Sequence, residues 1–176
     1  MKNIYERRSH GSSLAELAPA LFILFFLFVF PIINLGTLAL RYGLLATAAR
    51  DGAHAAATAY TFESGSTGKP AALNKTPKAV LDLINNYSGI TVKNIDVDIL
   101  VTDINTQAVT RHADKLNQPA NTQSNIYSLE SIVTAELSPL MPFDMPFLAD
   151  VPGLTGPWTT TVRAREYAEN SQGLNQ

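Results

Sequence analysis

Cysteine is missing from this chain of 176 residues, and charged residues are scarce in it. The lack of cysteine excludes disulfide scaffolds, thiolate metal sites and cysteine nucleophiles. Only 16% of the residues are charged, against roughly 25% in an ordinary soluble domain. The formal net charge of −2 gives no basic excess, so no nucleic-acid partner is expected. Intrinsic disorder is not expected either, because 46% of the residues are apolar.

The missing charge has one location, the segment between Glu16 and Arg41. These 24 residues, 17–40, read LAPALFILFFLFVFPIINLGTLAL. As a helix they would measure about 36 Å, and the hydrocarbon layer of a membrane is about 30 Å thick. Residues 22–30 are apolar at every position, so no polar face exists there. We therefore expect one membrane span surrounded by lipid, with a kink at Pro31.

Basic residues before the span set its expected orientation. Lys2, Arg7 and Arg8 precede it, which favours a cytoplasmic N-terminus and a periplasmic C-terminal domain of a single-pass inner-membrane protein. A removable secretory signal is the alternative, although its apolar region is usually only about 7–15 residues long. In that case a secreted domain would be cleaved near Ala48.

A carboxylate stands at the mouth of the span. Taken alone, Glu16 would sit at the membrane surface, facing water and favoured by the helix N-terminus. Its context suggests more, because Glu16 is the fifth residue after Gly11 and follows a short basic leader. This arrangement resembles a class III prepilin processing site, where a prepilin peptidase cuts after the glycine. The resemblance implies cleavage between Gly11 and Ser12, which would remove residues 1–11 and keep the helix.

The resemblance also implies a role for Glu16. Cleavage would leave a free ammonium at Ser12, and in pilin-like assemblies the glutamate of one subunit neutralises the terminal amine of its neighbour. Such a pair attracts strongly in low dielectric, and an unpaired charge there is penalised. The pair would therefore set the register between subunits as well as hold them together.

The Ala-rich segment after the span resembles a second family signature. Residues 48–57, AARDGAHAAA, are similar to the AREGAR-type segment of TadE-like pseudopilins of the tight-adherence (Tad, or Flp) pilus system. The C-terminal LSPLMP motif at residues 137–142, followed by a terminal strand, is similar too. Leu17 and His54 depart from the family pattern, which commonly has an aromatic residue and a second arginine there. The resemblance implies a minor pilin of a Flp-type IVb adhesive pilus. Its partners would be other pilin and pseudopilin subunits and the inner-membrane assembly platform.

Small residues recur along the helix that we expect over residues 14–61. Gly36, Ala39, Gly43 and Thr47 form a line that lets another helix approach closely, which we interpret as a packing interface for a neighbouring subunit. The alternative is packing against the protein's own sheet, which we favour for residues 49–60.

The remaining chain predicts a small α+β domain, pilin-like in outline. A short helix should run from Thr76, its N-cap, and Pro77 to about Asn86. Alternating apolar residues predict strands at 90–104, around 129–137 and around 158–164, which would form a three-stranded antiparallel sheet. Residues 105–125 are polar and predict a long exposed loop. The expected divisions are the leader 1–11, the long helix 12–62, the extracytoplasmic domain 63–168 and a frayed polar tail 169–176.

Two features of this domain leave alternatives open. Asp96 and Asp98 share a strand face and could hold a cation with Asp103, or could be a solvated face. The proline-rich stretch 139–157 could be an exposed partner surface or core lining, and includes Leu140, Met141, Phe143, Met145, Phe147 and Leu148.

No catalytic residue is expected from the sequence. His10, His54 and His112 show no metal-ligand spacing, and no nucleophile motif or cofactor fingerprint occurs. The sequence therefore predicts a protein that is not an enzyme and has no cofactor or metal. If the leader is retained, the alternative function is a permanently anchored periplasmic binding or sensing module.

Overall fold

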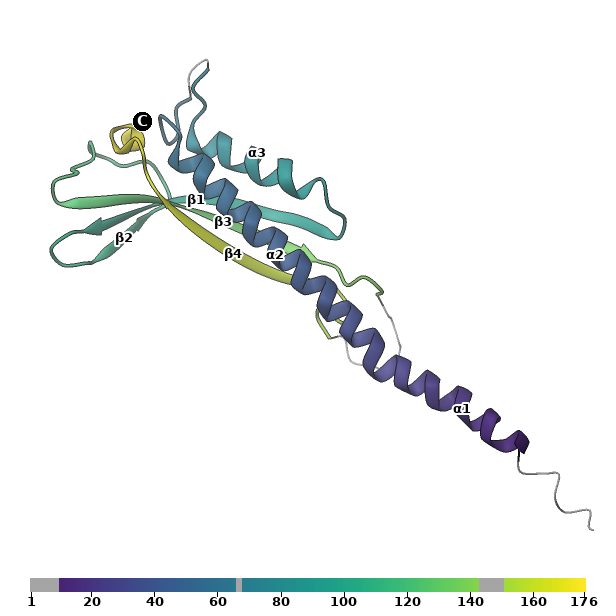
Figure 1. Cartoon of the computed structure of the whole chain (residues 1–176). Coiled ribbons are helices and arrows are strands. Elements are labelled where there is room, and N and C mark those ends of the chain that lie inside the picture. Colours follow the sequence, from purple (N-terminus) through teal and green to yellow (C-terminus); the bar gives the residue numbers. More distant parts are fainter. Residues whose placement is uncertain (1–9, 66–67, 143–150) are drawn as a thin grey trace, which may run out of the picture.

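A single long helix organises the molecule (Figure 1). The computed structural model describes residues 10–65, 68–142 and 151–176, and side chains from residue 17 onward. α1, His10–Leu24, passes through a π-helical turn, Phe25–Val29, into α2, Phe30–Ala57, without a break. The π-helical turn lies just before Pro31, which lacks the N–H that a regular turn would use there. This π-helical turn stands next to the position where a kink was expected, and the helix ends at Ala57 instead of Thr61.

Within the residues that the structure describes, the sheet has four antiparallel strands, one more than the three expected. Its order is β2-β1-β3-β4, where β1 is Ile90–Asp103, β2 is Val109–His112, β3 is Asn125–Leu137 and β4 is Trp158–Tyr167. The additional strand β2 lies inside the segment 105–125, which was expected to be a loop. β2 pairs with residues 99–102 of β1, and a tight turn after Asp103 connects the two strands. Its four residues are mostly polar and exposed, so no local apolar pattern marked it.

One face of the sheet is covered by α2 and by α3, Ala72–Ile84 (Figure 1). Small residues of α2 are buried there and let the backbones approach; they are Ala48, Ala49, Gly52, Ala53, Ala56 and Ala57. A Cβ on Gly52 would lie 2.8 Å from Ser131 Oγ and 2.8 Å from Val80 Cγ2. The prediction that residues 49–60 pack against the protein's own sheet is confirmed for the helical part of that range.

Two local predictions are wrong. α3 begins at Ala72, so Thr76 is not its N-cap but lies inside the helix, where its hydroxyl donates to Gly52 O at 3.3 Å. The tail is not frayed, because residues Ser171–Asn175 form a 3₁₀-helix and Leu174 is buried. The Phe62 N–H donates to Gly173 O, which fixes this tail beside the end of α2. In both cases a distant segment supplies the partner.

Candidate functional site

The expected processing residues lie at the start of the long helix. Gly11 and Ser12 are in the first turn of α1 and Glu16 is in the second. For these residues the structure describes the backbone alone. The first amides of a helix have no partner within it, so this turn is the easiest to unwind. A peptidase that needs an extended backbone at Gly11 would therefore meet little resistance here.

The helix that follows is bare. Residues 17–29 are exposed or half-exposed, and in Figure 1 this part projects away from the sheet. Phe22 stacks on Phe26, which stacks on Phe30, with ring centroids 5.6 and 5.7 Å apart. The helix is long and apolar enough to cross a membrane. That agreement covers length and composition, the two properties from which a span was expected.

The expected interface residues lie on the exposed side of α2, where Ala39 also borders a groove with Pro152 and Trp158. Gly36, Ala39, Gly43 and Thr47 are all exposed, and a Cβ on either glycine would meet no atom within 4 Å. The Thr47 hydroxyl donates to Gly43 O at 3.0 Å, so its polarity is satisfied within the helix. We call these four residues the small-residue strip. It leaves a shallow, largely apolar surface along one side of α2.

The opposite side of the same helix holds the proline-rich loop. Asn34 is completely buried, and its Nδ2 donates to Met141 O at 3.1 Å and to Leu154 O at 3.0 Å. Its Oδ1 accepts from the Met141 N–H at 3.0 Å. One side chain thus joins the two described parts of the loop, 138–142 and 151–157, to the helix. Arg41, one residue beyond the uncharged run, donates to Ser138 O.

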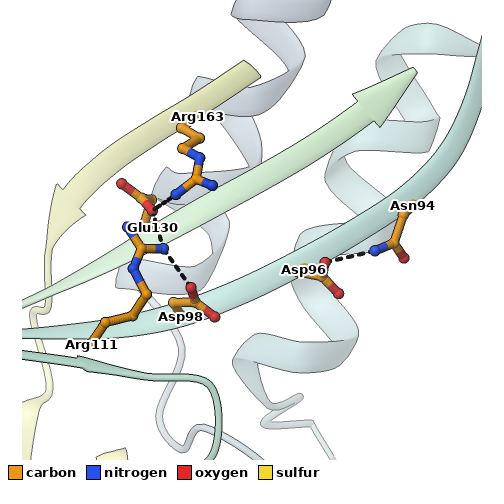
Figure 2. Close-up of polar contacts among 6 residues, drawn as sticks. All are labelled: Asn94, Asp96, Asp98, Arg111, Glu130 and Arg163. Atoms are coloured by element: carbon orange, nitrogen blue, oxygen red, sulfur yellow. Dashed lines mark hydrogen bonds and ion pairs between the residues drawn. The ribbon is translucent and has the colours of Figure 1, made fainter. Parts of the chain in front are cut away.

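A charge cluster lies on the sheet face opposite α2 and α3 (Figure 2). Asp98 on β1 and Glu130 on β3 are directly paired across the strands. Arg111 Nη1, from β2, lies 2.5 Å from Asp98 Oδ2 and 2.5 Å from Glu130 Oε2. Arg163 Nη1, from β4, reaches Glu130 Oε2 at 3.5 Å. All four strands therefore contribute, and the two carboxylates raise the pKa of Arg111 above its ordinary value.

The aspartates for which a cation site was one of two alternatives have other partners in the structure. Asp98 is neutralised by Arg111, and Asp96 accepts a hydrogen bond from Asn94 Nδ2 at 2.6 Å. The Asp103 carboxylate accepts from the amides of Asn105 and Thr106, both at 2.8 Å, and these bonds lower its pKa. Within the described ranges no group of three or more ligating side chains could hold a metal ion. The solvated-face alternative is also wrong for Asp98, which is buried.

Two residues that hold the structure together, Asn34 and Arg111, were not identified from the sequence. Asn34 had a visible signal, since it is the one amide in an otherwise apolar run and would be costly there without partners. Arg111 gave no comparable signal, because the short strand that carries it has no apolar alternation. Of the proline-rich hydrophobic residues, Leu140 and Met141 are exposed and the other four lie outside the described residues.

Comparisons of the chain with protein-family models, with curated protein sequences and with solved structures find no match.

Proposed function

We propose that the chain is a TadE-like minor pilin or pseudopilin that takes part in assembling a tight-adherence (Flp-type IVb) pilus. The observation that carries the proposal is the Gly11-x4-Glu16 arrangement at the start of one long helix. The first part of this helix is apolar and exposed, and its second part packs on the sheet. Such a helix can anchor a subunit before assembly and pack beside other helices after it. The exposed small-residue strip supports the second step.

Processing follows from the position of Gly11. A prepilin peptidase would cleave between Gly11 and Ser12 at the inner membrane, leaving an ammonium at Ser12 one helical turn before Glu16. Glu16 would then pair with the amine of a neighbouring subunit in low dielectric. The domain would remain on the periplasmic side with the assembly platform, or enter the filament.

The test uses the full chain in cells that contain a prepilin peptidase and in matched cells with an inactive one. We expect intact-mass measurement of membrane-extracted protein to show the loss of residues 1–11 only when the peptidase is active. Gly11→Val should block this processing, because a bulky residue does not fit a tight scissile site. Ser13→Ala is the matched control and should be processed normally.

An intact N-terminus in the cells with active peptidase would overturn the proposal. It would favour the permanently anchored periplasmic binding or sensing module instead. Protein recovered without residues 17–40 would indicate a secreted domain.

The second test concerns Glu16. Glu16→Ala should leave membrane insertion unchanged and reduce the co-purification of pilin subunits by at least about tenfold, the effect of losing about 1.4 kcal/mol. Glu6→Ala is the control, since Glu6 would leave with the leader. Equal co-purification of the two variants would contradict the pairing role.

A further inference from the structure

We propose that the two described parts of the proline-rich loop lie in the outer leaflet of the membrane, in contact with lipid. The proposal concerns residues 139–142 and 151–155, here called the proline collar, and no part of it depends on residues 143–150. It rests on the proposed membrane anchoring of the helix, and adds a second lipid-contacting element that the helix alone does not require.

The depth of the collar follows from the length of the bare helix. Residues 17–29 span only about 20 Å at about 1.5 Å per residue, whereas the hydrocarbon layer is about 30 Å thick. If the layer begins after Glu16, it must extend about 10 Å beyond Val29 to near Gly36. The collar contacts the helix within that interval, where Phe30 and Asn34 are buried.

Exposed apolar residues on the other side of the helix also indicate how far lipid extends along it. Ile32 is 67% exposed, Leu35 is 58% exposed and Leu40 is 73% exposed, although all three are apolar. Lipid that covers Ile32 and Leu35 reaches the level of Gly36, and Leu40 lies about 6 Å above that level at about 1.5 Å per residue. The collar packs against the same stretch of helix from the opposite side, so it lies at the same height.

The collar itself is built for an apolar surrounding. Leu140, Met141 and Val151 are large apolar residues that are about half exposed. Exposed irregular backbone is excluded from lipid unless its polar groups are satisfied. Most backbone N–H groups of the collar are satisfied. That of Met141 donates to Asn34, and the prolines have none. Those of Val151, Gly153, Leu154 and Thr155 donate to acceptors within the loop.

Aromatic residues stand at the expected boundary. Tyr42 on α2 and Trp158 at the start of β4 stack with ring centroids 6.0 Å apart, just above the collar. Tyrosine and tryptophan gather at the membrane–water interface. Both border a groove of about 420 Å³ that is also lined by Leu35, Leu38, Ala39 and Pro152.

The absence of cysteine allows a direct test with single spin labels on the full chain. The protein would be reconstituted in phosphatidylcholine–phosphatidylglycerol vesicles, and the label's collisions with oxygen and with a water-soluble nickel chelate compared. Leu140→Cys reports the collar, Leu27→Cys reports the bare helix and Thr106→Cys reports a turn in water. We expect oxygen to dominate at the first two positions and nickel at the third.

The outcomes separate the two proposals. Nickel contact at Leu140→Cys with oxygen contact at Leu27→Cys would overturn the collar and leave the span. Nickel contact at both positions would overturn both. A label at Leu140→Cys that meets neither reagent would place the collar against protein, such as a second copy, and would also overturn it.

Trp158 provides a check without substitution, because it is the chain's only tryptophan. Its fluorescence should be quenched more by lipids brominated near the headgroup than by lipids brominated near the chain end. Absence of quenching by either lipid would contradict its place at the boundary.

Discussion

Asp98 and Glu130 face each other across β1 and β3, and one guanidinium, that of Arg111, binds both carboxylates. Like charges directly opposite one another on neighbouring strands destabilise a sheet. Arg111 reverses this effect and also fastens the short edge strand β2, which has only four paired residues, to the centre of the sheet. The cluster is therefore best explained as a structural contact that attaches β2 to the rest of the sheet.

Replacing Arg111 should expose that dependence. We expect Arg111→Met to lower the free energy of unfolding by about 2–3 kcal/mol, because two nearly buried carboxylates lose their shared partner. The measurement is urea unfolding of the full chain in detergent micelles, followed by circular dichroism. Adding Glu130→Gln to Arg111→Met should restore part of the loss. Arg50→Met, an exposed arginine on α2 away from the cluster, is the control, and an equal loss there would contradict the specific role.

Asn34 should be equally sensitive for a different reason. Asn34→Leu keeps the size of the side chain but leaves the Met141 N–H and the carbonyls of Met141 and Leu154 without their partner. We expect a loss of about 1–3 kcal/mol and faster proteolysis of the proline-rich loop. Asn117→Leu, an exposed position in another loop, should change neither. Unchanged proteolysis of Asn34→Leu would mean that the loop is held by packing alone.

Sequence reasoning succeeded for elements with a local pattern and missed Arg111 and Asn34, whose partners are distant in sequence. The bare helix and strands β1, β3 and β4 follow from local patterns: an uncharged run, and alternation such as that of Val97 and Ile99. β2 does not, since its four residues are stabilised by pairing and by Arg111, and both partners are distant in sequence. The start of α3 was misplaced for the same reason.

The candidate site also has features that the sequence predicts and features that it does not. The exposure of the small-residue strip follows from helical periodicity, once the opposite face is known to be buried. The aspartates Asp96, Asp98 and Asp103 were correctly placed on one strand, but their partners were not visible. A carboxylate pattern alone does not tell whether an arginine, an amide or a metal ion will satisfy it.

The turn after β1 should respond to acid. Two backbone amides hold the Asp103 carboxylate and lower its pKa below the ordinary value of 3.8. A lowered pKa means that the contact stabilises the fold above pH 3.8 and is lost as the pH falls through the folded value. The Thr106 amide signal in an NMR titration should therefore shift with a midpoint below 3.8. Asp103→Asn keeps an acceptor but does not titrate, so the shift should vanish while the turn persists.

Two glycines of α2 should respond in opposite directions to the same change. Gly52→Ala would place a methyl group 2.8 Å from Ser131 Oγ and Val80 Cγ2, and we expect a loss of about 1–3 kcal/mol from overpacking. Gly43→Ala meets no atom of the chain and should gain about 0.5–1 kcal/mol from helix propensity. Unfolding in detergent micelles measures both. Similar effects at the two positions would contradict the assignment of buried and free faces.

A larger residue at Gly43 separates folding from assembly. Gly43→Leu should leave the unfolding free energy close to that of Gly43→Ala, because the side chain has open space within the subunit. If the small-residue strip packs against a neighbouring helix, the added bulk should prevent close approach and reduce co-purification of partner subunits. Arg50→Leu, at an exposed site further along the same helix, is the control and should assemble normally. Normal assembly of Gly43→Leu would show that neighbouring helices do not approach along this strip, whatever their identity.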